Sequence, residues 1–403
     1  MGVQLAQLMG DIAERLANGV ELIAEAQAGS IQKIEDWYSI NRIIKSGMGR
    51  QFFPIGDQIL DTWEKASGTE YQAPWDVVNH YENGDMALNW HFAIPDGIPY
   101  DQPEAIYYAP AAGLPAGQYY ITIGYNYGTG WVAGKHINFT LQNAMEAGDQ
   151  LVLTTATNNA NDPTNGMAWN VYAKGGTESK ENGVTSESTE GTELGSTSAS
   201  GVGYTNGQVN APQRVVYGYN RWSQSAIRQW LNSVAAAGSW WAPQNGWDRP
   251  PSVASTLRGF LAGYGEDFLS ILKPYPVVTA LNTVEGAQET TETTYDKIFL
   301  PSLQEMYINT QLANVEGEDW EYYVELAREI GLTGRFGTHP NTYEVLKKYN
   351  ISSQSSAVGV WLRSCVRGAA GNDWFIYSAG YVYTHAAYSS DRGCPACIIQ
   401  KSE

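Results

Sequence analysis

The chain has 403 residues, of which 42 are acidic and 24 basic, and its formal net charge is −18. This negative surplus repels phosphate backbones, so the composition argues against a DNA or RNA partner. The three cysteines, Cys365, Cys394 and Cys397, are too few and too clustered for a disulfide-stapled secreted domain, and they fit synthesis in a reducing cytoplasm.

The N-terminal region predicts helices. Apolar residues recur at three- and four-residue steps from residue 3 to about 27, and a second helix is expected from Ile31 to Ile44, ahead of Gly47. An apolar stripe has to be buried, so we expect residues 1–48 to attach the protein to a neighbouring subunit; the alternative is that both helices pack on their own domain. The region lacks the pattern of an export signal, and no apolar run along the chain is long enough to predict membrane insertion.

Residues 51–214 read mainly as strands. Short apolar runs between turn residues, such as Trp75–Val78, predict strands up to Pro95. Residues 105–153 then alternate between apolar and polar side chains, as the strands of a β-sandwich do. Residues 174–209 are rich in Gly, Ser, Thr and Glu and nearly free of apolar side chains, which predicts long exposed loops.

Beyond residue 215 the pattern mixes helices and strands. We predict a serine-capped helix over Ser223–Asn232 and a short buried strand leading into a turn over Asp296–Glu305. Another helix is predicted over Glu318–Ile330, because Gly331 stands where a helix stop belongs. Together these signals indicate an α+β protein.

The C-terminal end is crowded with aromatic and short polar side chains. Between residues 375 and 385 most odd positions carry rings, so a strand there would present them on one face: Phe375, Tyr377, Tyr381, Tyr383 and His385. With the neighbouring Ser and Asp residues, this is the composition of an antibody-like binding surface, in which rigid rings supply contact area and short polar groups supply hydrogen bonds. The alternative is an aromatic-rich core strand.

The sequence contains no convincing motif for catalysis or metal binding. Cys394 and Cys397 have the spacing of a redox or half-zinc motif, but they lie in a terminal strand and two further zinc ligands at similar spacing are missing. No nucleophile motif such as Gly-x-Ser-x-Gly is apparent, and Asp296 and Glu305 read as capping or turn acids. Calcium would need more oxygen ligands than the Asn372–Asp373 pair supplies. We therefore expect no enzyme activity, no metal and no cofactor.

Four separated segments share their order and spacing with a known family: Phe53–Asp57 with Trp75–Val78, Ser225–Asn232, Asp296–Ser302 with Glu305, and Trp-Leu-Arg-Ser at 361–364 followed by Pro-Ala-Cys-Ile-Ile at 395–399. This pattern resembles the C-type-lectin-like domains of bacterial surface proteins and bacteriophage virion proteins. The resemblance implies a discontinuous C-type-lectin-like domain over residues 49–95 and 215–403, with an inserted β-sandwich over residues 96–214.

In phage members of this family the C-terminal segment is similar to the variable region targeted by diversity-generating retroelements, in which adenine mutagenesis converts Asn codons to Tyr, His, Asp, Ser and others. The resemblance implies a scaffold of Trp361, Leu362, Pro395, Ile398 and Ile399. It implies a ligand-facing set of Asn372, Asp373, Phe375, Tyr377, Tyr381, Tyr383, His385, Tyr388, Ser390 and Asp391.

The implied function is adhesion. A phage virion surface protein of this kind would be made in the host cytoplasm and would bind a host cell-surface glycan or protein through its Tyr-rich C-terminal face. Its N-terminal helices would contact other virion proteins, and a homotrimer is the expected assembly. One alternative is a structural decoration or cement protein of the capsid or tail with no receptor of its own; another is a cell-wall-degrading enzyme.

Overall fold

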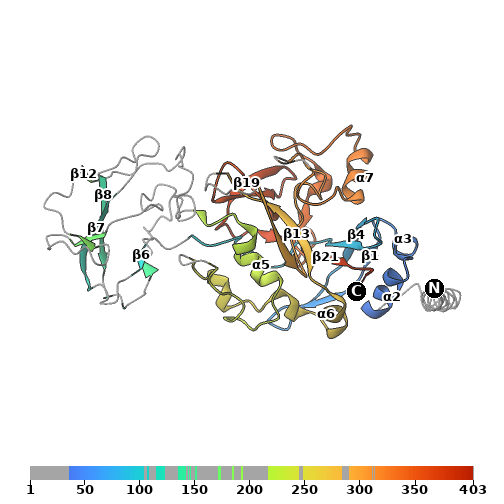
Figure 1. Cartoon of the computed structure of the whole chain (residues 1–403), viewed down its shortest axis with the longest axis horizontal. Helices are drawn as coiled ribbons and strands as arrows, with labels where there is room; N and C mark the ends of the chain where they lie inside the picture. The colour runs from blue at the N-terminus through green and yellow to red at the C-terminus, as the bar shows by residue number, and fades with distance from the viewer. Residues whose placement is uncertain are drawn as a thin grey trace, which may run out of the picture.

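The structure, a computed structural model, describes residues 36–103, 217–244, 248–283, 290–310 and 314–402, residue 312, and shorter stretches between 107 and 193. The helix predicted over residues 3–27 lies outside these residues, as do most of the loops predicted over 174–209. The α+β class is confirmed at that level, because several small sheets combine with a few short helices (Figure 1).

The first sheet joins the two ends of the described chain. Its order is β1-β4-β5-β21, and every neighbouring pair is antiparallel. The strands are β1 (Gln58–Ile59), β4 (Trp75–His80), β5 (Met86–Trp90) and β21 (Ala396–Ile399). All residues of β5 and β21 are buried, including the polar Asn89, whose side-chain amide donates to the carbonyls of Cys394 and Pro395. A hairpin of β2 (Thr62–Glu64) and β3 (Glu70–Gln72) follows β1 in the chain.

The second sheet carries the Tyr-rich segment. Its order is β19-β18-β17-β20, with β17 and β20 parallel. The strands are β17 (Val360–Cys365), β18 (Asn372–Ile376), β19 (Val382–Ala386) and β20 (Arg392–Gly393). Two smaller pairs are β13 (Tyr275–Ala280) with β14 (Thr291–Asp296), and β15 (Lys348–Tyr349) with β16 (Ala357–Val358). The strand predicted over Asp296–Glu305 is reduced to one bridge from Phe299 to Ala396, although Ile298–Leu300 are buried as expected.

The helices are short. The α-helices are α2 (Trp37–Lys45), α3 (Gly49–Phe52), α5 (Ala226–Leu231), α6 (Glu266–Ile271) and α7 (Glu321–Glu329). The 3₁₀ turns are η3 (Trp222–Gln224), η4 (Ser252–Ser255), η5 (Phe260–Gly263) and η6 (Glu344–Leu346). The predicted helices near 223–232 and 318–330 are confirmed as α5, capped by the Ser225 hydroxyl, and α7, which ends before Gly331. Among the described residues, none of these helices combines the length and apolar character needed to cross a bilayer.

Helix α2 belongs to the body of the protein. The Trp37 ring lies 4.5 Å from that of Phe268 in α6, and the Trp37 indole donates to Asp61 at 2.8 Å. Ile40, Ile43 and Ile44 are also buried in the common core. The prediction that residues 1–48 form an attachment segment is therefore wrong for α2, whose apolar face is buried within its own chain. The earlier part of that segment lies outside the described residues.

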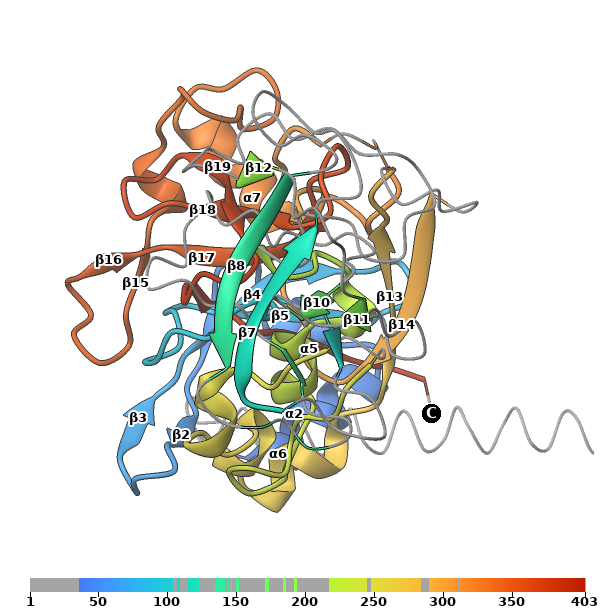
Figure 2. The same cartoon turned by 90° about the vertical axis from the view of Figure 1, so that its left-hand side faces the viewer.

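Between residues 107 and 193 the described strands form their own sheets. One has the order β11-β10-β7-β8-β12 and the other pairs β6 with β9. The strands are β6 (Tyr107–Tyr108), β7 (Gly117–Thr122), β8 (Lys135–Leu141), β9 (Gln150–Leu151), β10 (Val171–Ala173), β11 (Val184–Thr185) and β12 (Thr192–Glu193). Strands β7 and β8 are the long pair in front in Figure 2. None of these strands joins a sheet of the other described segments, so the β-sandwich insertion stays a prediction.

A buried ion pair holds β17 in place. Arg363 is 1% exposed, and its guanidinium donates to the carboxylate of Glu305, to the carbonyl oxygen of Leu300 at 2.8 Å and to that of Glu316 at 3.0 Å. The hydroxyl of Ser364 donates to the Glu316 carboxylate at 2.7 Å. The Arg-Ser half of Trp-Leu-Arg-Ser thereby ties β17 to two loops. Glu305 also caps its turn as predicted, but the pairing with Arg363 had no signal in the sequence.

We expect Arg363→Met and Glu305→Gln each to lower the free energy of unfolding by about 3–5 kcal/mol, because each leaves a buried charge unpaired. Urea unfolding measures this. Arg50→Met is the matched control, since the Arg50–Glu321 pair is largely exposed and should contribute at most about 1 kcal/mol. Equal effects of the buried and exposed variants would contradict the assigned role.

Candidate ligand-binding site

The predicted aromatic strand is a hairpin. Strands β18 and β19 are antiparallel, with Phe375 opposite Tyr383 and Asp373 opposite His385, and residues 377–381 form the loop between them. In this register odd residues pair with odd residues, so they share one side of the sheet. The prediction of one continuous strand is wrong, whereas the shared face of the odd strand residues is confirmed.

Gly380 shapes the tip of the hairpin. Its φ is +85°, and a Cβ at this position would lie 2.3 Å from the carbonyl oxygen of Tyr343. The Gly380 amide donates to the carbonyl of Tyr377 at 2.8 Å, and its own carbonyl accepts from the amide of Tyr343 at 2.8 Å. A side chain is thus excluded by both conformation and space, and the loop is held against residue 343.

Four rings at this tip form the surface that we call the aromatic face: Tyr377, Tyr381, Tyr383 and His339. The rings of Tyr377 and Tyr381 stack at 4.8 Å, and His339 lies 5.1 Å from Tyr381 and 5.2 Å from Tyr383. Tyr377 is 43% exposed and Tyr383 50% exposed. Ring contacts therefore fix the orientation of side chains that remain open to a ligand.

Phe375 does not reach the surface. It is 3% exposed and lies between the Trp361 ring at 6.1 Å and the Tyr377 ring at 5.9 Å, while the His385 ring stacks on it at 4.8 Å. The prediction that Phe375 faces a ligand is wrong, because neighbouring rings cover it. Phe375 instead supports the side chains that are exposed, and the scaffold prediction for Trp361 agrees with its complete burial.

Asp373 is also buried, with 0% exposure, and its two carboxyl oxygens lack a hydrogen-bond partner among the described residues. Burial raises the pKa of Asp373 well above the usual range of a carboxyl, and the charge of Asp101 raises it further. The segment containing Asp101 crosses this end of the sheet, where its amide donates to the carbonyl of Ala387 at 3.0 Å. The prediction that Asp373 contacts a ligand is therefore wrong.

His385 joins two polar side chains from the loop after β19. Its Nδ1 lies 2.5 Å from Oδ2 of Asp391, and its Nε2 lies 3.2 Å from Oγ of Ser389. The His385 side chain is 44% exposed and that of Asp391 18% exposed. Ser389 is outside the ligand-facing set implied by the resemblance, and it lies in no Gly-x-Ser-x-Gly motif that would mark it as a nucleophile.

The other predicted residues lie at the margins. Tyr388 stacks on Tyr217 at 6.5 Å, and its amide donates to the Tyr217 carbonyl at 2.8 Å. Ser390 is exposed. Asn372 is half-buried and, as an even position of β18, lies on the opposite side of the sheet from His385. Tyr388 and Ser390 can therefore extend the surface, but Asn372 does not join the aromatic face.

His339 was not predicted to lie at this surface. His339 reaches the aromatic face because Thr338 bridges to Val382 and the His339 amide donates to the carbonyl of Val382 at 2.8 Å. The two segments are more than 40 residues apart in the chain. The local sequence pattern could not predict that His339 lies here, because its position depends on a single bridge between a loop and β19.

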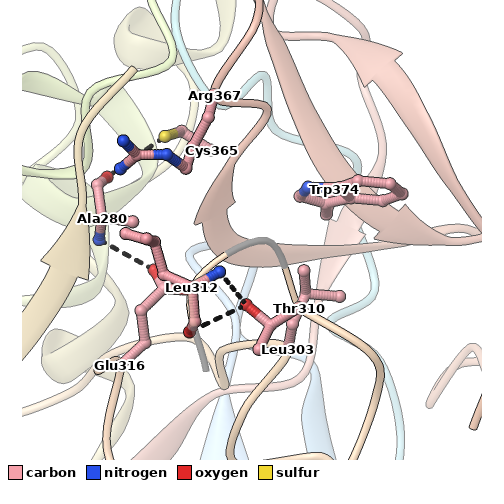
Figure 3. Close-up of a pocket in the computed structure, with 8 residues that line it drawn as sticks. All are labelled: Ala280, Leu303, Thr310, Leu312, Glu316, Cys365, Arg367 and Trp374. Carbon is pink, nitrogen blue, oxygen red and sulfur yellow. Dashed lines mark hydrogen bonds between the residues drawn. The ribbon is translucent and has the colours of Figure 1, made fainter. Parts of the chain in front are cut away.

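A narrow crevice, too small to admit a ligand, lies by Trp374 (Figure 3). Several of its polar groups are engaged within the protein: the Ala280 amide donates to Glu316 at 2.9 Å, and the Cys365 thiol donates to the Ala280 carbonyl at 3.1 Å. The buried Trp374 indole nitrogen has no hydrogen-bond partner among the described residues. We assign no ligand to the crevice. The residues that line it are Ala280, Leu303, Thr310, Leu312, Glu316, Cys365, Arg367 and Trp374.

The two cysteines of Cys-Pro-Ala-Cys are buried and unbonded to each other. Burial raises the pKa of Cys394 to about 11 and that of Cys397 well above the usual range of a thiol, so both stay protonated near neutral pH. Cys397 is buried as the small apolar residue that was predicted. Within the described part of the chain, no group of three or more His, Cys, Asp or Glu side chains is arranged to hold a metal ion.

Comparison with known proteins assigns no activity. Residues 203–401, just under half of the chain, match a family described as "Domain of unknown function (DUF6273)". The matched region contains the whole aromatic face and the loop after β19. No curated protein matches the chain significantly, and no solved structure does.

We expect Asp373→Asn to stabilise the protein at pH 7 and above by about 1–3 kcal/mol, because it removes a buried carboxyl that loses its proton unfavourably. A folded pKa above the unfolded value near 3.9 means that the folded chain binds more protons. Stability from this group is therefore greatest below that pH and falls as pH rises through the folded pKa.

Urea unfolding of both proteins between pH 5 and pH 8 measures the difference. Asp57→Asn serves as control, because the Asp57 side chain is exposed. A difference between parent and Asp373→Asn that stays constant with pH would contradict this assignment.

Proposed function

We propose that this protein is a bacteriophage virion surface protein that binds a glycan or protein on the host cell surface through its aromatic face. The observation that carries the proposal is the exposure of Tyr377 and Tyr383 within a group of rings that already contact one another. Tyrosine offers a large apolar ring with a polar tip and loses little rotamer entropy on binding, which is why such rings dominate antibody paratopes.

Rigidity supports a role in recognition. The loop is closed by Gly380, the rings are oriented by His339, and β18 is paired along the buried strand β17. A surface that is already ordered loses less conformational freedom when it binds. Rings of this kind stack on the apolar face of a sugar or fill a pocket on a protein receptor. Binding of this type is non-covalent.

We propose a discontinuous C-type-lectin-like domain as the scaffold, made of residues 49–95 and 215–403. Its support is the antiparallel pairing of β21 with β5, which places the C-terminal strand beside a strand more than 300 residues earlier. The buried roles of Trp361 and Arg363 add to this, since they belong to the segment that carries the family resemblance. Residues 96–214 would then be an insertion between the two parts.

Diversification of the C-terminal face can be tested in natural sequences. We expect copies of the gene from one phage population to differ at exposed or half-buried positions such as Tyr377, Tyr381, Tyr383 and Tyr388. Phe375, Asp373, Trp361 and Ile398 should stay fixed, because they are buried. Differences spread evenly along the chain would instead favour the cement protein, which needs no receptor-specific surface.

Several copies on one particle would strengthen weak binding. In the homotrimer that we propose, simultaneous engagement of several sites raises avidity by about 10² or more if the geometry allows it. A receptor site of modest affinity therefore suffices for attachment.

We expect the double variant Tyr381→Ala/Tyr383→Ala to lose attachment to host cells while its melting temperature stays within a few degrees of the parent, because partly exposed rings contribute little to folding. Flow cytometry with labelled protein and scanning calorimetry measure these two effects. Tyr295→Ala is the matched control: Tyr295 is 69% exposed, but it lies on β14. Equal loss in the control, or full attachment by the double variant, would refute the proposal.

A further inference from the structure

We propose that Ser389, His385 and Asp391 form a nucleophilic triad that accepts acyl groups from esters. The triad has the connectivity that this chemistry needs, with serine Oγ 3.2 Å from Nε2 of the histidine and the aspartate Oδ2 2.5 Å from Nδ1. All three residues lie within seven positions of one another, at the end of β19 and in the loop that follows it.

The hydrogen bonds define the roles of the two ring nitrogens. An ionised carboxylate only accepts hydrogen bonds, so with Asp391 ionised Nδ1 of His385 carries a hydrogen and donates a hydrogen bond to the carboxylate. In the neutral imidazole Nε2 is then a free acceptor, and the Ser389 hydroxyl donates to it. This is the protonation pattern in which a histidine can remove the proton of a serine.

The histidine ring and the loop that carries the other two residues are each held in place. The His385 ring stacks on Phe375 at 4.8 Å, and the Ser389 amide donates to the carbonyl of Ala386 at 2.9 Å. The Asp391 carbonyl accepts from the amide of Ile98 at 2.8 Å. These contacts hold the histidine ring and the backbone of the loop that carries Ser389 and Asp391, while the His385 side chain stays 44% exposed. A positioned base and nucleophile are worth more than their separate side chains.

The reaction balances without any further component. Oγ of Ser389 attacks the ester carbonyl carbon as its proton passes to Nε2, and the carbonyl electron pair moves to oxygen. The tetrahedral adduct then collapses, the alcohol leaves with the proton from Nε2, and an acyl-serine remains. Water repeats the sequence with Nε2 as base, which releases the carboxylic acid and restores Ser389.

The geometry favours esters over amides. Serine nucleophiles often use their own amide as an oxyanion donor, but the Ser389 amide is already bonded to Ala386. Loss of one such donor lowers rates by about 10²–10³, which a reactive ester tolerates better than an amide.

Tyr383 points to the class of ester. It lies on the same side of β19 as His385, two residues away, and two residues along a strand span roughly 7 Å. A sugar ring stacked on Tyr383 would bring an O-acyl group close to Ser389. This last step, an O-acylated sugar as substrate, rests on the proposed binding function, whereas the nucleophile itself does not.

A fluorophosphonate probe tests the nucleophile directly. We expect it to modify the full-length protein at Ser389, identified by peptide mass spectrometry. Ser389→Ala should abolish labelling, and His385→Gln should slow it by about 10²–10⁴, the usual contribution of a general base. The control is Ser355→Ala, which removes an exposed hydroxyl outside the predicted ligand-facing set and should label within twofold of the parent. With p-nitrophenyl acetate the parent should release a burst of nitrophenol that Ser389→Ala lacks.

Absence of labelling in the folded parent, or modification of Ser390 at an equal rate, would overturn the inference. Peptide mapping of the parent gives this answer even if a variant fails to fold. Because the probe requires no host cell, a negative result leaves the binding proposal standing, and that proposal fails only on the tyrosine variants.

Discussion

The guanidinium of Arg363 is the group on which the arrangement of the C-terminal half depends. It is almost completely buried, and a buried guanidinium is tolerated only when its donors are satisfied and its charge is paired. Its acceptors come from the carbonyl of Leu300, the carboxylate of Glu305 and the carbonyl of Glu316. Two loops are therefore held against β17, and the position of that strand is fixed.

The fixed position of β17 also determines where the next two strands of the sheet lie. Strand β18 pairs along β17, and β19 pairs along β18, so the exposed edge is two strands away from the ion pair. The rings of Trp361 and Phe375 fill the space between, and His385 stacks on the outer one. A packed interior thus supports a surface that carries exposed tyrosines and the partly exposed His385.

The rings at odd positions show which features of the site the local sequence pattern could predict. That these rings lie on one side of the sheet was predictable from the alternation alone. The hairpin keeps them on one side because its register pairs odd residues with odd residues. Exposure was not predictable. Residues 98–101 run across one end of this side: the Trp361 indole donates to the Ile98 carbonyl at 3.1 Å, and the Asp101 amide bonds to Ala387. That segment closes over Asp373, while the tip remains open.

By itself the sequence determined the negative charge, the α+β class, the helices α5 and α7 and the common side of the C-terminal rings, because each follows from composition or from contacts between near neighbours. Tertiary structure alone decided which of those rings meet solvent, that His339 joins them, and that Ser389 lies within hydrogen-bond distance of His385. The physical reason is distance along the chain and loop geometry. Whether a face is buried depends on which segment, distant in the sequence, covers it. The alternation of residues in the covered strand carries no information about that segment.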